Sequence, residues 1–522
     1  MELLIKILQT KKTKQLIFFS ALLLSLLLIS ACADNSDLTA QNGQNGVAEI
    51  GGGEPAGTPG EAGESSEPDE SAAAVRLTPD LPDRDFDGLE IRLLGRRYDL
   101  ACNVRHYSET ASEELSGELM NDAVFRRNSY IEEKYNVTIT RIISNDGSSL
   151  FGDIRRSVNA GDNDFDAAFA SIGDSSRLAQ DGLLVSLHDV PYLNLSQPWW
   201  DQRSVEGLSI GGRLHFVVGD VTPWADPFTW IVVVNKDLIE RYNLDDPYQL
   251  VRDNNWTFDT FYRLGSAVIS DLDGDGTITR FDRRGVMSAR ENFAFTFVAG
   301  GESIIRKDEN DLPYLAMNTA RAVNVAQSIF DMMMSDFSLI VDDYFGLYND
   351  PWFEVLRTQF RNGNGLFYMG GLEQMLIFRD LEAYIGVLPM PKFDSNQEEF
   401  HHILNAHWAS SLCIPVTNDR LAETGFVLEA LAAESRYTIM PALYDLTLTQ
   451  RMLRDEDSAE MLDIIRASRA YDLGIIFNWG DAAGIFSGML ARGTFNFTSE
   501  LERITPRVEQ QIARAIERFA EN

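Results

Sequence analysis

The chain has 522 residues, of which 44% are hydrophobic, so it can bury a large core and is expected to divide into more than one folded domain. Its 79 acidic residues outnumber its 45 basic residues and give a net charge of −34. Because a field of that sign repels phosphate backbones, the composition excludes nucleic acid as a partner.

The first 31 residues have the pattern of an export signal. A charged segment comes first and carries four lysines, Lys6, Lys11, Lys12 and Lys14. The apolar run that follows at 16–29 is shorter than the roughly 20 residues that a membrane span needs. No second apolar run of spanning length follows, so we expect the rest of the chain to lie outside the membrane.

The string Leu28-Ile29-Ser30-Ala31-Cys32 resembles the lipobox of bacterial lipoproteins. The resemblance implies that the signal peptide 1–31 is removed and that Cys32 is acylated, palmitate included, and anchors the chain at the extracytoplasmic face of the cell membrane. The alternative is a coincidental cysteine after an ordinary secretory signal. Without residues 1–31 the chain loses four Lys and one Glu, which leaves 41 basic and 78 acidic residues.

A tether is predicted at 32–82. Residues 33–75 contain eight Gly, three Pro and nine acidic residues, with no Lys, Arg, Phe, Tyr or Trp. Such a segment has nothing to bury and is expected to stay disordered, continuing through Pro79 and Pro82 to about Asp83.

Strand and helix patterns alternate after the tether. Strands are predicted at 89–94, 137–143, 165–170, 215–218, 230–234 and 384–388. Helices are predicted at 121–136, 258–269 and 421–433, and in the last segment, where Ile504, Val508, Ile512, Ile516 and Phe519 recur at helical spacing. Strand, helix and strand in succession imply parallel pairing, so the predicted class is α/β.

The remaining cysteines and the histidines indicate no chemistry of their own. Cys102 and Cys413 are compatible with one disulfide bridge or with two buried thiols. His401, His402 and His407 are clustered, but their spacing fits no helical pair of zinc ligands. We therefore expect no zinc site there.

Several strings together resemble family 1 bacterial extracellular solute-binding lipoproteins, the maltose- and oligosaccharide-binding components of ABC importers. The strings are Asn121-Asp122-Ala123-Val124, Glu132-Glu133-Lys134-Tyr135-Asn136-Val137, Asn235-Lys236-Asp237-Leu238, Trp256-Thr257-Phe258-Asp259 and Gly386-Val387-Leu388-Pro389-Met390-Pro391-Lys392. The resemblance implies a two-lobe, type II periplasmic-binding-protein-like fold, in which each lobe is a mainly parallel sheet flanked by helices and a hinge joins the two.

The same resemblance predicts lobe boundaries. Lobe 1 would comprise 83–227 and 386–445, and lobe 2 would comprise 228–385 and 446–522. The hinge crossings would lie near 221–234, near 386–392 and around 446.

A calcium loop is predicted at 271–282 in lobe 2, because the segment matches the ligand pattern of an EF-hand. The expected ligands of this structural Ca²⁺ are Asp271, Asp273, Asp275, Thr277, Thr279 and Asp282. Gly276 permits the sharp turn, whereas Asp282 is one methylene shorter than the usual Glu. The segment after the loop is predicted to be a strand, which favours a braced surface loop over a sensing helix pair. An acidic turn without metal is the alternative.

A sugar site needs aromatic platforms beside polar groups, and the sequence offers candidates for both. The predicted ligand-binding residues are Ser171, Asp174, Arg177, Trp199, Trp200, Trp224, Asp226, Trp230, Trp408 and Trp479. Three of them follow the strand at 165–170, where loops at the carboxyl ends of parallel strands line a crevice. For each tryptophan, packing in the core is the alternative.

These observations predict a monomeric solute-binding protein, not an enzyme, that captures an oligosaccharide between its lobes and delivers it to the permease subunits of an ABC importer. A surface-anchored glycan hydrolase is one alternative, since two carboxylates about 5–10 Å apart would suffice. The sequence contains no Gly-x-Ser-x-Gly elbow and no phosphate-binding Gly-rich loop with Lys. A peptide-binding or adhesion lipoprotein is the other alternative.

Overall fold

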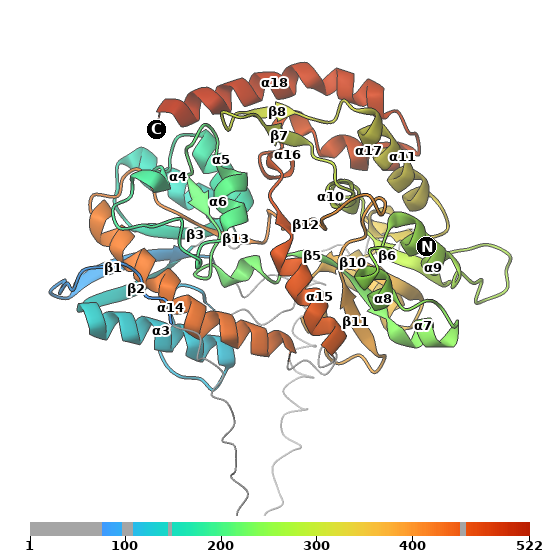
Figure 1. Ribbon diagram of the computed structural model, residues 1–522, viewed down its shortest axis with the longest axis horizontal. Coiled ribbons are helices and arrows are strands. Elements are labelled where there is room, and N and C mark those ends of the chain that lie inside the picture. The colour runs from blue at the N-terminus through green and yellow to red at the C-terminus, as the bar shows by residue number, and fades with distance from the viewer. Residues whose placement is uncertain (1–75, 97–107, 145–148, 449–455, 522) are drawn as a thin grey trace, which may run out of the picture. The chain divides into compact units, whose positions relative to one another are not determined.

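The computed structural model describes residues 76–96, 108–144, 149–448 and 456–521 (Figure 1). The predicted signal peptide, Cys32, most of the tether and Cys102 lie outside the described residues. Two five-stranded sheets organise the described part, one on the left and one on the right of Figure 1.

The first sheet has the strand order β2-β1-β3-β13-β4. The bounds are Val137–Ile143 for β2, Leu89–Gly95 for β1, Ala167–Ser171 for β3, Ser410–Cys413 for β13 and Phe216–Val217 for β4. Strand β1 pairs in parallel with β2 and β3, as the succession of strand and helix predicted. Strand β13, which comes from far along the chain, is antiparallel to both of its neighbours.

Two helices cover one face of this sheet. Helix α3 (Leu119–Tyr135) ends at Asn136, which takes the left-handed conformation (φ 50°) that Asn tolerates better than most residues, and the chain enters β2 at once. Helix α14 (Leu421–Leu448) packs against α3. It runs well beyond the predicted 421–433, continuing past Pro441.

The second sheet has the order β11-β5-β10-β6-β9. The bounds are Ile385–Leu388 for β11, Trp230–Asn235 for β5, Gly365–Gly371 for β10, Arg284–Ser288 for β6 and Ser338–Ile340 for β9. Both faces of β5 are buried, because Val232 and Val234 point into the main hydrophobic core while Ile231 and Val233 join a second cluster. Helix α15 (Glu456–Ala467) covers that second cluster.

Three segments join the two sheets. Thr229 forms an isolated bridge with Leu404, and the short strand β12 (His402–Ile403) pairs in parallel with β14 (Arg469–Ala470). The first crossing therefore lies between β4 and β5, at 218–229, and overlaps the predicted 221–234.

The second crossing begins inside the predicted 386–392, but the lobe boundary predicted at 386 is too early. Strand β11 pairs with β5 in the second sheet, so the chain leaves that sheet after Leu388 and not at 386. The return to the first sheet is complete only at β13. Helix α14 packs on the first lobe and α15 on the second, and the connection between them at 449–455 lies outside the described residues.

The C-terminal part also departs from its predicted assignment to lobe 2 alone. Helix α18 (Phe497–Glu521) contacts α5 (Ile172–Gln180) of the first lobe as well as α11 (Ala320–Met334) of the second. Figure 1 shows α18 extending above both sheets. Its apolar residues line one face, as their spacing predicted.

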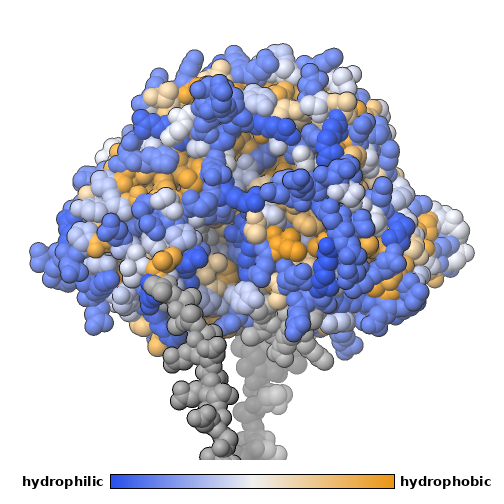
Figure 2. Space-filling model, viewed as in Figure 1, coloured by the Kyte–Doolittle hydropathy of each residue, from blue (hydrophilic) through white to orange (hydrophobic). Residues whose placement is uncertain are grey.

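The predicted tether ends earlier than 82. Arg76 forms an ion pair with Glu434 and lies over the ring of Tyr437, both on α14, and Leu81 packs on the core. Figure 2 shows a face on which hydrophilic side chains predominate. Among the described residues, no helix combines the length and apolar character that crossing a membrane requires.

Candidate ligand-binding site

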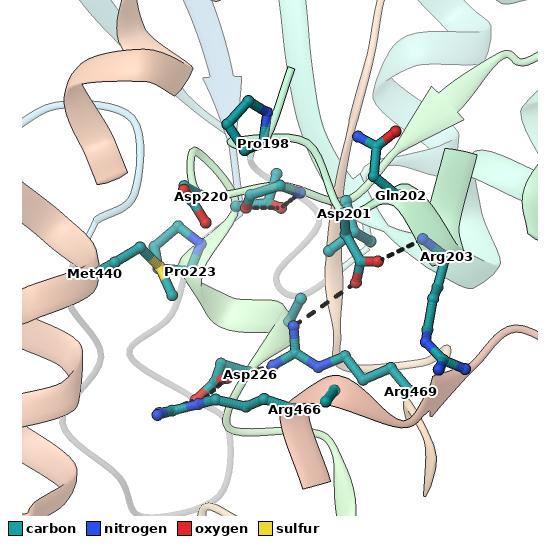
Figure 3. Close-up of a pocket in the computed structure, with 15 residues that line it drawn as sticks. Pro198, Asp201, Gln202, Arg203, Asp220, Pro223, Asp226, Met440, Arg466 and Arg469 are labelled. Atoms are coloured by element: carbon teal, nitrogen blue, oxygen red, sulfur yellow. Dashed lines mark hydrogen bonds and ion pairs between the residues drawn. The ribbon is translucent and has the colours of Figure 1, made fainter. Parts of the chain in front are cut away.

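A cluster of ion pairs holds the hinge segments together (Figure 3). Asp226, which precedes β5, accepts hydrogen bonds at 3.0 Å from Nε and from Nη2 of Arg466, and it also pairs with Arg469. Burial alone would raise the pKa of Asp226, but the two guanidinium groups lower it to about 2. Asp226 is therefore a charged structural partner of the segment that leads from α15 to β14.

Two further carboxyls line the same small hollow of about 290 Å³. Asp201 lies 3.8 Å from Arg469 and accepts a 2.7 Å hydrogen bond from the Tyr471 hydroxyl. Burial raises the pKa of Asp220 to about 7, although Arg436 lies 3.3 Å away. Because its arginines are already engaged with its carboxylates, this hollow is typical of a hinge brace.

A second cavity of about 500 Å³ lies between the second sheet and the returning crossing segment. It is lined by Trp230, Glu291, Asp350, Trp352, Arg357, Tyr368, Met369, Gly370, Glu373, Gln374, Asn405, His407 and Trp408. Aromatic rings, carboxyls, amides and one guanidinium thus face one enclosed space. This composition is typical of sites for small polar ligands with apolar faces.

The aromatic side of the cavity is held by contacts outside it. Trp230 donates its indole N–H to Asn292 Oδ1 at 2.8 Å. Trp408 stacks on Phe228, with ring centroids 6.2 Å apart and an interplanar angle of 26°, and meets His407 edge to face. These rings come from β5 and from the chain between β12 and β13, so both sides of the hinge contribute platforms.

The carboxyls of the cavity lie next to the ends of elements in the second lobe. Glu291 precedes α10 (Asn292–Ala299), and Glu373 follows β10. Burial raises the pKa of each carboxyl to about 7. Glu291 nevertheless retains access to solvent through the cavity, whereas Glu373 is only 5% exposed.

Gly371 allows the Glu373 carboxyl to lie against the backbone, because a Cβ at this position would overlap Glu373 Oε2. Gln374 donates to the other oxygen, Oε1, at 2.9 Å. Oε2 is buried without a hydrogen-bond partner.

Of the ten predicted ligand-binding residues, Trp230 and Trp408 line this cavity and Asp226 lines the hinge hollow. Ser171, Asp174 and Arg177, which follow the predicted strand at 165–170, make structural contacts instead. Ser171 caps α5 by accepting the Asp174 N–H at 3.1 Å, and Asp174 accepts the Leu150 N–H at 2.8 Å. The guanidinium of Arg177 lies over the Phe151 ring, 3.7 Å from its centroid.

The other four predicted tryptophans lie in the core, where packing explains them. Trp199 and Trp200 donate their indole N–H groups to the two oxygens of Glu429 at 3.1 and 3.0 Å. Trp224 is 1% exposed, and Trp479 stacks on Phe477. None of the four lines the cavity.

Four residues of the cavity were not predicted from the sequence: Trp352, Glu291, Arg357 and Glu373. Glu291 carries one signal in the sequence, because it follows the strand predicted after the calcium loop, as the 171–177 loop follows the strand at 165–170. Loops at the carboxyl ends of strands line the crevice in both lobes, not only in the first. Trp352 and Arg357 lie on one irregular helical turn (Trp352–Arg357), which has no periodic pattern of its own.

The predicted calcium ligands Asp271, Asp273 and Asp275 each offer a carboxylate oxygen within 4.8 Å of the others. Gly274 and Gly276 take positive φ angles of 76° and 83°, which curl the loop around these oxygens.

Asp282 plays a bracing part in that loop. Its two oxygens accept the N–H groups of Leu272 at 2.8 Å and of Thr279 at 2.6 Å. A bridge between Ser270 and Arg283 closes the loop, and β6 follows as predicted, with no second helix. The three converging carboxylates fit a hard cation. Like Asp282, each of them also accepts at least one backbone N–H of the loop.

The histidine and cysteine clusters show no reactive arrangement in the described residues. His402 is buried, with Nε2 accepting the Met390 N–H and Nδ1 bonded to Ser468, and burial lowers its pKa to about 3. Cys413 is a free thiol buried in β13, where burial raises its pKa to about 12. His402 and Cys413 therefore have structural roles in the protein core.

Three solved structures share this fold. A cyclo/maltodextrin-binding protein in complex with maltotetraose is 14% identical, with a TM-score of 0.50 over 83% of this chain and 96% of that chain. UspC of M. tuberculosis is 14% identical, with a TM-score of 0.50 over 82% and 100% of the two chains. MalE of Bdellovibrio bacteriovorus bound to maltotriose is 12% identical, with a TM-score of 0.50 over 81% and 100%.

At these identities the likeness establishes the fold, so the predicted two-lobe, type II periplasmic-binding-protein-like class is confirmed. The two five-stranded sheets are mixed and not mainly parallel as predicted, because each has two parallel and two antiparallel pairings. By sequence alone, no protein family profile and no curated protein matches the chain.

Proposed function

We propose that this chain is an extracytoplasmic solute-binding lipoprotein that captures an oligosaccharide in the cavity between its lobes and delivers it to an ABC importer. The observation that carries the proposal is the cavity wall itself. Trp230, Trp352 and Trp408 supply flat rings for the C–H faces of sugar units, and Glu291, Gln374 and the other polar side chains supply hydrogen bonds for hydroxyls.

The position of the cavity supports capture by closure. Trp408 belongs to the chain that returns to the first sheet, whereas Trp230 and Glu373 belong to the second. A rotation at the hinge would therefore change the distance between the two sets of groups and could enclose a ligand. The solved structures with this fold include proteins bound to maltotetraose and to maltotriose, which supports a carbohydrate as the ligand class.

The proposal is tested on the compact part of the chain, residues 75–522, with a broad panel of oligosaccharides. We expect at least one glycan to shift the tryptophan fluorescence and to raise Tm, and to be recovered intact. If no glycan changes either signal, the chain does not bind carbohydrate.

A glycan hydrolase is a second candidate, and one observation favours it. Glu291 and Glu373 line the same cavity, and both have a pKa raised to about 7, as a general acid requires. Chromatography of the glycan after prolonged incubation separates the two proposals, because a hydrolase yields shorter products. Two solved structures that share the fold, those bound to maltotetraose and to maltotriose, are named as maltodextrin-binding, which supports the non-enzymatic proposal.

The lipid anchor follows from the sequence of the export signal. Acylation at Cys32 would hold a monomer at the membrane and present its cavity to the importer. Metabolic labelling with a palmitate analogue tests it. Wild-type chain is expected to carry the label and to sediment with membranes, whereas C32A is expected in the soluble fraction.

A structural Ca²⁺ at 271–282 belongs to the same proposal. Asp271, Asp273 and Asp275 would hold the ion, and the ion would neutralise their mutual repulsion. The pKa of Asp273 supports this. Its hydrogen bond from the Asp275 N–H lowers the pKa, but slight desolvation and the charges of the neighbouring carboxylates raise it more, although the side chain is exposed.

A further inference from the structure

The charged groups on the wall of the ligand cavity are out of balance. Three carboxyls line it, those of Glu291, Asp350 and Glu373, against one guanidinium, that of Arg357. Arg357 directs its Nε to Gln374 Oε1, 3.4 Å away. In the described part of the chain, none of the three carboxyls lies within ion-pair distance of a basic side chain.

Buried carboxyls elsewhere in this protein have partners. Asp166 pairs with Arg92 and Arg420, and Glu302 pairs with Arg321 at 3.0 Å. Glu429 accepts two indole N–H groups. Among the described carboxyls, Glu373 supplies the one buried oxygen without a hydrogen bond.

An unpartnered buried carboxyl is costly, since burial disfavours its charged form. Glu373 Oε2 is the oxygen without a partner, and Glu373 lines a cavity. A molecule that enters the cavity can therefore donate the missing hydrogen bond. Burial raises the pKa of Glu373 most, whereas the charge of Arg357 lowers it and the charge of Glu291 raises it. The single guanidinium is outnumbered by the carboxyls on the wall, so Glu291 and Glu373 together favour a cation.

The aromatic rings favour the same partner. Trp230, Trp352 and Trp408 surround the cavity, and indole faces attract ammonium groups as well as sugar C–H groups. A sugar ring that carries a protonated amine can thus bind both the carboxyls and the indole rings of the cavity.

We infer that the ligand is a glycan that contains an amino sugar with a free, protonated amine, which lies between the Glu291 and Glu373 carboxylates. This inference rests on the proposed capture of a carbohydrate and narrows its ligand class. A neutral glycan would leave Glu373 Oε2 with hydroxyl donors only, whereas an ammonium group supplies charge-assisted hydrogen bonds to both carboxylates.

The test compares three versions of one backbone, each titrated calorimetrically into the purified full chain at pH 7. Oligomers of glucosamine, N-acetylglucosamine and glucose with the same β-1,4 linkage differ only at carbon 2, and further free-amine, N-acetylated and neutral sets extend the panel to other linkages. We expect the free amine to bind at least about tenfold more tightly than its N-acetylated version.

The outcomes are distinguishable. If a neutral or N-acetylated glycan binds as tightly as its free-amine version, the inference is overturned and carbohydrate capture stands. If no glycan in the panel binds, the proposed function fails, and the inference fails with it.

Variants locate the effect in the cavity. E373Q and E291Q keep the size of each side chain and remove its charge, so the ratio of the two dissociation constants is expected to fall toward one. E309Q removes one exposed charge in the turn between β7 (Ile305–Lys307) and β8 (Pro313–Leu315) and is expected to keep the ratio. Because the Glu291 side chain reaches solvent, E291Q also guards against a folding defect in E373Q. A preference that survives both cavity substitutions would overturn the assignment.

Discussion

Asp226 in the hinge and Glu373 in the ligand cavity are both buried carboxyls, 3% and 5% exposed, yet their pKa values move in opposite directions. The pKa of Asp226 falls to about 2 because Arg466 and Arg469 bind it. The pKa of Glu373 rises to about 7 because burial outweighs the Gln374 amide, its own backbone N–H and the more distant charge of Arg357. Burial is similar in the two places, so the difference lies in the partners that the fold supplies.

This comparison separates two uses of a charge in the interior. Where the chain supplies the cation, as in the hinge, the ion pairs join two crossing segments and leave no charge free for a ligand. Where the chain supplies none, as at Glu373, burial of the carboxyl reduces stability, and under the proposed function the ligand would supply the partner. The same contrast is seen between tryptophans, since Trp199 and Trp200 donate to Glu429 while Trp352 faces the cavity.

The largest effect is expected from breaking the hinge cluster. Asp226→Ala removes the only carboxylate that pairs with Arg466 in the described residues and leaves Arg469 with Asp201 at 3.8 Å, so the free energy of unfolding should fall by about 3–5 kcal/mol. Urea unfolding measures the change.

Asp189→Ala is the matched control, because Asp189 pairs with Arg213 at 2.6 Å but its side chain is 55% exposed. We expect this variant to lose less than about 1 kcal/mol. Equal losses in the two variants would show that burial of the pair does not set its strength.

The next effect concerns pH. The pKa of Glu373 rises from 4.5 to about 7 on folding, so between these values the folded state holds a proton that the unfolded state has released. This group therefore makes the protein less stable as pH increases from about 4.5 to about 7, and its full cost persists above that range. Asp226 acts in the opposite sense, since its contribution is lost as pH falls from about 4 toward about 2.

Glu373→Gln should remove the loss of stability that ionisation of Glu373 causes. The variant should therefore be more stable than the free wild-type protein at pH 8 by on the order of 2 kcal/mol, with little difference at pH 4. Unfolding curves at several pH values test this. Curves of the two proteins that stay parallel across pH would contradict it.

Much of the fold could be predicted from the sequence, because the patterns that specify single helices and strands are local. Short apolar and β-branched runs located β1, β2 and β5, and helical spacing located α18. The helix predicted at 121–136 includes Asn136, whereas α3 ends one residue earlier and Asn136 turns the chain into β2. By contrast, β13 contributes four residues to the first sheet from far along the chain, and no local pattern tells which sheet such a strand joins.

The site was harder to predict for the same physical reason. A tryptophan in the core and one in a cavity look alike in sequence, since both are large, apolar and have one N–H to satisfy. Trp230 and Trp408 were identified and Trp352 was not, while Trp199 and Trp479 proved to be core residues. The missing partner of Glu373 is a property of its surroundings in space.

The tryptophans provide a smaller test of the comparison. Trp352→Ala removes one platform from the cavity and should weaken binding of whichever panel glycan binds the wild type by roughly tenfold, with a minor change in stability because the side chain is only partly buried. Trp479→Phe, in the core, should lower Tm without changing the dissociation constant. Loss of affinity in Trp479→Phe alone would place the ligand elsewhere.

The smallest effect is expected at the exposed loop 271–282, where the cation would come from solution and not from an arginine. Asp271, Asp273 and Asp275 converge without a basic side chain bound to them, so Ca²⁺ should stabilise the chain and EDTA should lower Tm by about 2–4 °C. Asp273→Ala should abolish the difference in Tm between EDTA and Ca²⁺, whereas Glu309→Ala, which removes an exposed charge outside the loop, should keep it.

A Tm of the wild-type chain that is the same in EDTA and in Ca²⁺ would mean that the loop is an acidic turn, closed by Asp282 and its hydrogen bonds from Leu272 and Thr279. Because the loop is solvent-exposed, its repulsion is partly screened by water and salt, which is why its dependence on a cation should be weaker than that of the buried carboxyls.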